Sequence, residues 1–170
     1  EEVEPLVETE LKAQGLKVGS GFETGVQQGP LIDRNALAKV QAHIDDARTK
    51  GARIVTGGKP HELGGTYFQP TVLANVTEDM LVAREETFGP VAPVCTFTDD
   101  ADAVAKANGT EYGLGGYIYT NDQTRVIRVA EAMEFGMIGV NTGIVSNPAA
   151  PFGGVKQSGF GREGGFEGID

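Results

Sequence analysis

The feature that most constrains the fold is a regular alternation of helical and strand-like segments in the second half of the sequence. The order is helix, strand, helix, strand, at residues 101–107, 117–120, 125–133 and 138–141. Asp99 or Asp100 is suited to cap the first helix and Asp122 the second, because a short acidic side chain accepts a bond from a free backbone N–H. The alternation predicts an α/β fold with a mostly parallel sheet, flanking helices and right-handed crossovers.

The same alternation indicates where a ligand should bind. In parallel α/β sheets, ligands gather at the carboxyl ends of the strands. The loop that follows Val140 and Asn141 is therefore the expected position of a polar site.

The first half of the sequence mixes both kinds of element. Apolar residues at helical spacing predict a helix over residues 3–14, and a second helix that begins after the N-cap Asp33 and stops at Gly51. Strand-like composition occurs at residues 53–56, 67–76 and 91–97. Pro70 lies inside the second of these stretches and is typical of a strand boundary or an edge strand.

Neither histidine is interpreted as a ligand. His43 lies beside Ile44, off the apolar stripe of its helix, and we expect it to be partly exposed. His61 lies between two glycine-containing turns, where a solvated loop residue is expected. Because no second His or Cys follows at metal-ligand spacing, and Cys95 is the one cysteine of the chain, we expect neither a metal site nor a disulfide.

Charge and hydropathy exclude two classes of partner. The 170 residues include 24 acidic and 14 basic side chains, which give a formal net charge of -10 and no basic cluster for nucleic acid. No apolar run approaches the roughly 20 residues that a membrane helix needs, and the acidic start differs from a cationic signal peptide. We therefore expect one soluble, cytoplasmic domain.

Two features imitate functional motifs. Gly159, Gly161 and Gly164 match the dinucleotide pattern G-x-G-x-x-G, but too few residues follow them for the helix and the distant acidic residue that such a site needs. Cys95 lies in a β-like stretch without the cationic or helix-terminal surroundings of a reactive thiol, so we expect it to be buried and inert. From the residues alone, the prediction stops at an α/β domain with a polar loop site.

Five strings, in order and at their spacing, carry more information than any one of them. They are GPLID at 29–33, REETFGPV at 84–91, YGLG at 112–115, GVN at 139–141 and PFGGVKQSGFGRE at 151–163. Together they resemble the aldehyde dehydrogenase superfamily over nearly the whole chain. The resemblance implies the C-terminal part of the catalytic domain, a single domain over residues 1–170, whose tail at 151–170 runs back towards a cofactor domain that this chain lacks.

The resemblance assigns two residues to the cofactor. Glu86 matches the glutamate that binds the ribose hydroxyls next to the nicotinamide of NAD or NADP, and Phe88 matches the aromatic residue near that ring. A carboxylate can accept two charge-assisted bonds from a vicinal diol. The alternative interpretation is that Glu85 and Glu86 form a solvated pair at a helix end before Pro90.

Two further residues match the substrate side. Phe152 corresponds to an aromatic wall of the reaction site. Ser146 lies in the family loop that lines the aldehyde tunnel, at a position where a serine helps to hold a substrate carboxylate in the branch that oxidises succinate semialdehyde. The alternative interpretation makes Ser146 a loop residue that serves a turn beside Asn147 and Pro148.

The family nucleophile has no counterpart in this chain. The resemblance implies a cysteine, a general-base glutamate and an oxyanion asparagine upstream of residue 1, so that no catalytic residue is assigned here. In the implied reaction a thiolate attacks the aldehyde, hydride passes to the nicotinamide, and water releases the acid.

Three functions remain open. The first is oxidation of succinate semialdehyde to succinate by the complete protein, which is expected to be a homo-oligomer. The second is oxidation of another semialdehyde or an aliphatic aldehyde. The third is a non-catalytic binding or assembly module, which the missing nucleophile favours and the retained Glu86, Phe88 and Ser146 oppose.

Overall fold

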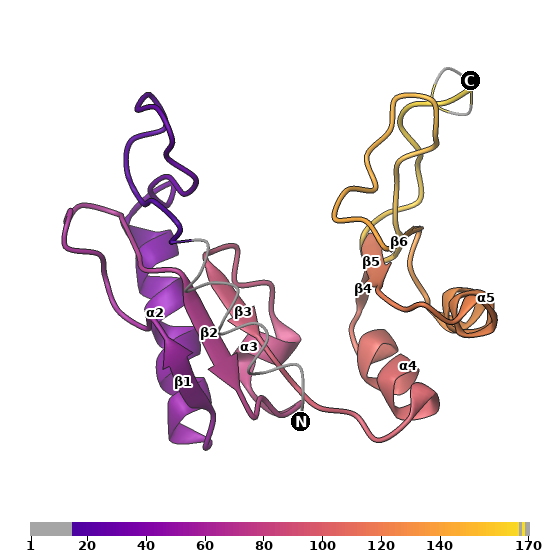
Figure 1. Ribbon diagram of the computed structural model, residues 1–170, viewed down its shortest axis with the longest axis horizontal. Helices are drawn as coiled ribbons and strands as arrows, with labels where there is room; N and C mark the ends of the chain where they lie inside the picture. Colours follow the sequence, from indigo (N-terminus) through magenta and orange to yellow (C-terminus); the bar gives the residue numbers. More distant parts are fainter. Residues whose placement is uncertain (1–14, 167, 169–170) are drawn as a thin grey trace. The chain divides into compact units, whose positions relative to one another are not determined.

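The computed structural model describes residues 15–166 and residue 168. The chain divides into two compact units, Glu1–Thr96 and Phe97–Asp170 (Figure 1). Both units combine helices with short strands, so the predicted α/β class is confirmed. The helix expected over residues 3–14 lies outside the described residues. The single domain over residues 1–170 and the course of its tail stay predictions.

The first unit is a three-stranded sheet with a long helix packed against it (Figure 1). Its elements are α2 (Arg34–Thr49), β1 (Arg53–Thr56), β2 (Thr71–Ala74), α3 (Leu81–Arg84) and β3 (Val91–Pro93). The central strand β2 pairs antiparallel with β1 and parallel with β3. As expected, β2 begins directly after Pro70.

Helix α2 forms where the sequence predicts it. The Asp33 side chain accepts a bond of 2.8 Å from the Ala36 backbone N–H, which satisfies a donor that the helix itself leaves free. Its apolar stripe of Val40, Ile44 and Ala47 is buried against Phe68, Leu73 and Met80. This contact between helix and sheet makes the core of the unit.

The second unit contains the predicted alternation of helix and strand. Its elements are α4 (Asp100–Asn108), β4 (Tyr112–Gly113), β5 (Gly115–Ile118), α5 (Gln123–Ala132), β6 (Met137–Val140) and β7 (Val155–Lys156). Asp99 and Asp122 cap the two helices. Strands β5 and β6 are parallel, as a helical crossover requires, while β4 and β7 form an antiparallel pair that the sequence did not predict.

The second unit is held together by backbone contact more than by buried side chains. A Cβ atom on Gly136 would collide with the carbonyl oxygen of Gly153, so the two chain segments approach each other as closely as only glycine allows. Among the described residues of this unit, Ile118 is the one buried hydrophobic side chain. Tyr119, Phe160 and Phe166 are largely exposed.

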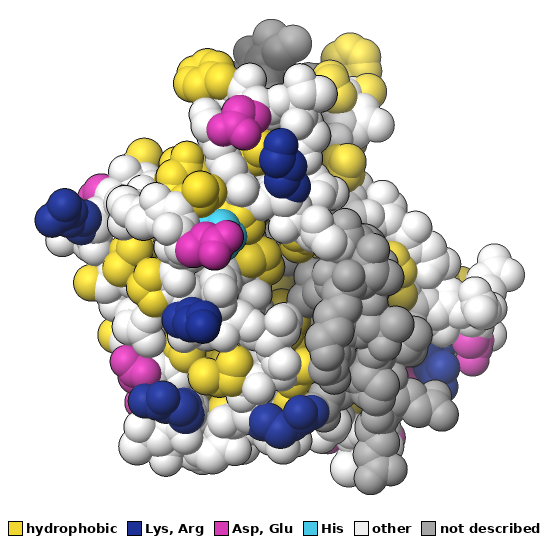
Figure 2. Space-filling view, turned by 60° about the vertical axis from the view of Figure 1, so that its left-hand side comes forward, with side chains coloured by type: hydrophobic (Ala, Val, Ile, Leu, Met, Phe, Trp, Pro, Cys, Tyr) yellow, Lys and Arg dark blue, Asp and Glu magenta, His cyan; other side chains and the backbone are white. Residues whose placement is uncertain are grey.

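Hydrophobic side chains also reach the surface elsewhere, as the face drawn in Figure 2 shows. In the first unit they include Phe22, Ile32, Leu63 and Phe88. No helix among the described residues is long and apolar enough to cross a membrane. Within the same residues, no group of three or more His, Cys, Asp or Glu side chains could hold a metal ion.

Two phenylalanines of the first unit test where the core lies. Phe68→Ala should lower the free energy of unfolding by about 3–5 kcal/mol, because Phe68 is fully buried and its removal leaves a cavity. Phe22→Ala, at a fully exposed position, should change it by less than about 0.5 kcal/mol. Denaturant titration of both variants measures the difference, and equal losses would show that the core is elsewhere.

Candidate functional site

Four polar side chains of α2 contact the 79–90 segment, which carries Glu86 and Phe88, and hold it against the helix. This row consists of Lys39, His43, Asp46 and Lys50, which are spaced by three or four residues and therefore lie on one face of the helix. Each of them contacts residues 79–87, so that the 79–90 segment runs along α2 in the opposite direction.

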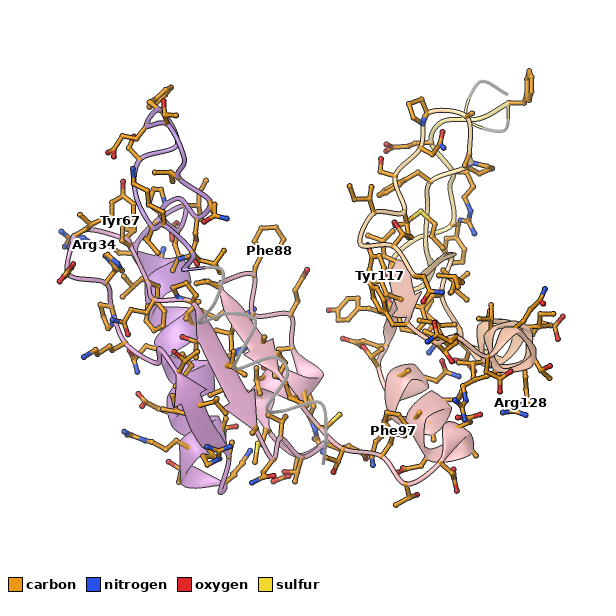
Figure 3. The ribbon with its side chains drawn as sticks, viewed as in Figure 1. Arg34, Tyr67, Phe88, Phe97, Tyr117 and Arg128 are labelled. Atoms are coloured by element: carbon orange, nitrogen blue, oxygen red, sulfur yellow. The ribbon has the colours of Figure 1, made fainter. Side chains whose placement is uncertain are left out.

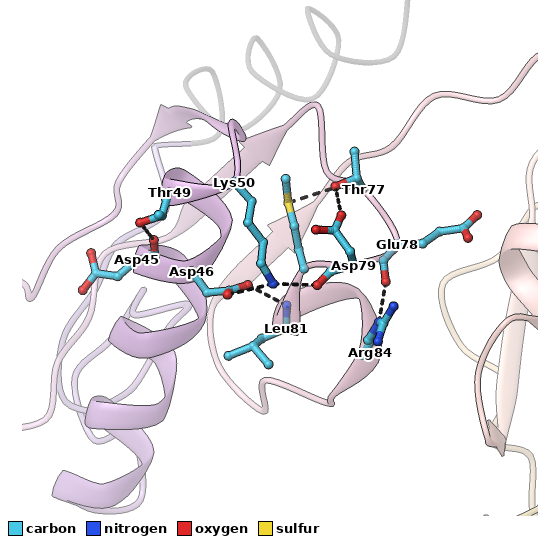
Figure 4. Close-up of polar contacts among 10 residues, drawn as sticks. Asp45, Asp46, Thr49, Lys50, Thr77, Glu78, Asp79, Leu81 and Arg84 are labelled. Carbon is cyan, nitrogen blue, oxygen red and sulfur yellow. Dashed lines mark hydrogen bonds and ion pairs between the residues drawn. The ribbon is translucent and has the colours of Figure 1, made fainter.

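One end of the row fastens the start of α3 (Figure 4). Asp46 accepts a bond of 2.8 Å from the Leu81 backbone N–H, at a helix terminus where the N-cap Met80 offers no side-chain bond. Lys50 lies 2.9 Å from Asp46 and donates a bond of 2.6 Å to the carbonyl oxygen of Asp79. The Leu81 N–H and then Lys50 lower the pKa of the Asp46 carboxyl.

His43 fastens the middle of the segment, and its expected exposure is wrong. The side chain is 2% exposed, because the 79–90 segment covers the flank of α2 that the helical stripe alone leaves open. Its Nδ1 lies 3.0 Å from the Thr87 hydroxyl and its Nε2 lies 3.5 Å from the Glu85 carboxylate. A buried imidazole is thus supplied with polar partners on both nitrogens.

Glu85 and Glu86 differ in what holds them. Glu85 pairs with His43. The Glu86 backbone carbonyl accepts a bond of 2.7 Å from Lys39, while its exposed carboxylate makes no hydrogen bond or ion pair within the described part of the chain. The Glu85 side chain is nevertheless 55% exposed at the end of α3, so the interpretation of a solvated pair at a helix end stays a prediction.

Phe88 projects from the same segment. Its ring is 80% exposed and stands away from the strands (Figure 3). Its φ of 49° is in the left-handed region, which non-glycine residues adopt where the surroundings hold them. The next residue, Gly89, is held against Val40 of α2, where a Cβ atom would collide with the valine side chain.

The substrate-side residues follow β6 in the second unit. Asn141 fastens the carboxyl ends of β5 and β6, because its amide nitrogen donates to the Thr120 carbonyl and its amide oxygen accepts from the Thr120 N–H, both at 3.0 Å. The loop that carries Ser146 begins at this clamp. Its position after β6 is the one predicted for a site in the sequence.

Ser146 is exposed, and the turn that follows it does not depend on its hydroxyl group. The side-chain oxygen of Asn147 accepts a bond of 2.9 Å from the Ala149 N–H, and its backbone carbonyl accepts one of 3.0 Å from Ala150. No hydrogen bond of the Ser146 hydroxyl occurs within residues 15–166. The turn therefore belongs to Asn147, and the serine is available to a ligand.

Phe152 is half-buried and is held by the glycine-rich tail. Its N–H donates to the Glu163 carbonyl at 2.6 Å, and the Glu163 N–H donates back at 2.7 Å. Arg162 donates to the Gly154 carbonyl at 2.8 Å. Gly159 to Gly164 thus form the return arm of a loop, and that the G-x-G-x-x-G match is not a dinucleotide site stays a prediction.

Lys156 is a positioning residue that the sequence did not single out. Its ammonium group donates to the Asn108 and Thr110 carbonyls at 3.0 and 3.1 Å, and lies 2.6 Å from the Glu134 carboxylate. The cation therefore satisfies the carboxyl end of α4, where the helix dipole favours positive charge. The one feature of the sequence that could have indicated this role is that Lys156 lies within the PFGGVKQSG string.

Cys95 is exposed, and its predicted burial is wrong. Strand β3 ends at Pro93, so Cys95 lies beyond the sheet that was expected to cover it. That it is not a nucleophile stays a prediction.

A pocket of about 240 Å³ lies between α4, α5 and β5, and none of the candidate residues lines it. Phe97, Tyr117 and Tyr119 contribute aromatic walls. Asp100 of α4 forms ion pairs with Arg125 and Arg128 of α5 and so joins the two helices beside it. The candidate residues thus lie in two places, Glu86 and Phe88 in the first unit, and Ser146 and Phe152 in the second.

Comparison with known proteins identifies the family. Residues 3–170 match the aldehyde dehydrogenase family. The chain belongs to this family. It superposes on the crystal structure of succinate-semialdehyde dehydrogenase from Burkholderia pseudomallei with a TM-score of 0.95 and 54% identity, over 99% of this chain and 35% of that one.

Curated relatives include enzymes for three aldehydes. Glutarate-semialdehyde dehydrogenase of Pseudomonas aeruginosa and the NADP(+) succinate-semialdehyde dehydrogenase GabD of Escherichia coli are each 57% identical over 155 residues, which are 91% of this chain and 32% of theirs. A 3-sulfolactaldehyde dehydrogenase of Pseudomonas putida is 56% identical over 158 residues, 93% of this chain and 32% of that protein. The chain thus spans about a third of the length of these relatives.

The contacts of the Asp46 carboxylate with the Leu81 N–H and Lys50 predict that stability depends on pH. The folded-state pKa of Asp46 lies below its usual value of 3.8, so the contact stabilises the fold above that pH and is lost as the pH falls through the lower folded value. Asp79, Asp100 and Asp102 also have lowered pKa values and act in the same direction. Unfolding measured below pH 5 should therefore show falling stability, and Asp46→Asn should make the decline shallower; an unchanged slope would contradict the assignment.

Proposed function

We propose that this chain supplies the nicotinamide-side and substrate-side walls of an NAD- or NADP-dependent dehydrogenase that oxidises succinate semialdehyde to succinate. The observation that carries the proposal is a difference between two neighbouring exposed carboxylates: the Glu85 carboxylate lies 3.5 Å from Nε2 of buried His43, while the Glu86 carboxylate has no such partner among the described residues. A free, oriented carboxylate beside an exposed aromatic ring is suited to hold a ribose and a flat heterocycle.

The residues present fit the cofactor chemically. The Glu86 carboxylate can accept two hydrogen bonds from the vicinal hydroxyls of a ribose, and the Phe88 ring can pack against a nicotinamide. When bound, the cofactor accepts the hydride that the aldehyde carbon loses on oxidation. Glu86 and Phe88 orient it and exclude water, and they take no part in bond making.

Ser146 and Phe152 are assigned to the substrate. The Ser146 hydroxyl can donate a bond to the carboxylate at the far end of the aldehyde, and the half-buried Phe152 provides an apolar wall. The three curated relatives act, by their names, on aldehydes that also carry a carboxylate or a sulfonate. That shared negative group supports an anionic substrate and favours another semialdehyde, such as glutarate semialdehyde, as the second candidate.

The proposal assigns the nucleophile to a part of the protein outside these 170 residues. Within the chain, Cys95 is the one thiol, and it lies two residues after the end of β3. The complete enzyme is proposed to be cytoplasmic and homo-oligomeric. Exposed Phe160 and Phe166 offer apolar surface to its other parts.

Substitution of Ser146 tests the substrate assignment. In the complete enzyme, Ser146→Ala should lower kcat/KM for succinate semialdehyde by about tenfold or more, since loss of a bond to a charged group costs roughly 1.5–3 kcal/mol. With butanal, an uncharged aldehyde of the same length, the variant should match the parent protein. Equal losses on both substrates would refute the contact with the carboxylate.

The isolated chain provides a second test. Alone it should oxidise no aldehyde and bind NADH or NADPH more weakly than micromolar, because the proposal leaves the nucleophile and most of the cofactor surface outside it. Calorimetry and a turnover assay measure the two properties. Turnover that Cys95→Ala abolishes would reverse the interpretation of that cysteine, and micromolar affinity would show a cofactor surface within this chain.

A further inference from the structure

We infer that His43 is a positioning residue for the cofactor. Although it touches neither cofactor nor substrate, it holds the residues on either side of Glu86 and thereby sets the direction of the Glu86 carboxylate. This inference rests on the proposed role of Glu86 and Phe88, and it adds a determinant of cofactor affinity that lies in the core of the first unit.

The two ring nitrogens of His43 lie beside the residues that precede and follow Glu86. Nδ1 lies 3.0 Å from the Thr87 hydroxyl, and Nε2 lies 3.5 Å from the Glu85 carboxylate. Because the imidazole is 2% exposed, a ring nitrogen that lost its partner would stay buried without one, which costs free energy. The ring therefore ties residues 85 and 87 to α2 at the same time.

Because His43 holds Glu85 and Thr87 against α2, the Glu86 side chain between them is directed away from the helix. Glu85 has extended backbone angles, φ -115° and ψ 139°, and in extended chain successive side chains point to opposite sides. Glu85 and Thr87 each place a side-chain oxygen beside His43, although the Glu85 side chain stays 55% exposed, and the exposed Glu86 between them has no such contact. Lys39 adds a bond of 2.7 Å to the Glu86 carbonyl, which restricts rotation of the peptide.

The anchor extends to Phe88. Its left-handed φ of 49° is a conformation that a non-glycine residue leaves readily unless neighbouring contacts hold it. The Thr87 bond to His43 holds the chain before Phe88, and the contact of Gly89 with Val40 holds it after. Loss of the histidine would free one of these two sides.

The test uses the complete protein with His43→Phe, which keeps a ring in the core and removes both nitrogens. Calorimetric titration with NADH and with NADPH should give a Kd about tenfold higher for whichever the parent protein binds, the change expected when one charge-assisted bond is lost. The KM for the cofactor should rise in parallel, and the KM for the aldehyde should stay unchanged. Hydrogen exchange of the amides at 85–89 should become faster.

Two further variants separate positioning from stability. Ile44→Val alters the next residue of α2, which is buried against the core and does not contact the 79–90 segment through a polar group, so it should lower Tm without changing the cofactor Kd. Thr87→Val removes one partner of His43 and should weaken cofactor binding, with little further loss in the His43→Phe background, since both changes break the same bond.

The outcomes distinguish this inference from the proposal beneath it. If Glu86→Gln leaves the cofactor Kd unchanged, the role of Glu86 fails, and the role of His43 fails with it. If Glu86→Gln weakens binding while His43→Phe and Thr87→Val bind the cofactor normally, the positioning role alone is overturned. Should His43→Phe fail to fold, Thr87→Val decides, and an unchanged Kd for that variant refutes the inference.

Discussion

The row of Lys39, His43, Asp46 and Lys50 along α2 is the contact on which the first unit's candidate site depends. The 79–90 segment contains one short helix of four residues and little regular hydrogen bonding of its own, so its path is set by the side chains that reach it from α2. These side chains bind backbone carbonyls, a backbone amide, the Thr87 hydroxyl and the Glu85 carboxylate of the segment, whereas the Glu86 carboxylate and the Phe88 ring are exposed to solvent. The anchor thus determines which groups can meet a ligand.

The second unit positions its candidate residues by a different physical means. Few of its described side chains are buried, and the backbone itself supplies the close contacts, with Gly136 lying against Gly153 and Phe152 pairing with Glu163. Lys156 joins the end of α4 to this arrangement through two carbonyls. The glycines at 136 and 153 therefore allow the backbone segments of this unit to approach each other closely.

Local features were predicted well, and burial was predicted poorly. The caps at Asp33, Asp99 and Asp122 lie where the sequence places them, because a cap is decided within four residues. The ends of the strands predicted at 117–120 and 138–141 moved by one or two residues, whereas those predicted at 67–76 and 91–97 are shorter, at Thr71–Ala74 and Val91–Pro93. Strands β4 and β7, of two residues each, were missed. His43 and Cys95 were assigned the wrong exposure, since each depends on whether a segment distant in sequence covers it. The spacing of polar residues at 39, 43, 46 and 50 was a signal of the anchoring face that periodicity of apolar residues alone ignores.

By itself, the sequence determined the α/β class, the positions of the capped helices and, through five ordered strings, the aldehyde dehydrogenase family. These depend on local hydrogen bonding, on periodicity and on the identity of residues in order. The tertiary structure decided that Glu85 lies beside His43 while Glu86 does not, that Asn147 and not Ser146 makes the turn, and that His43 is buried. Adjacent residues of the same type receive different roles only when chain segments far apart in sequence meet, because the partner that satisfies one of them is supplied from across the fold.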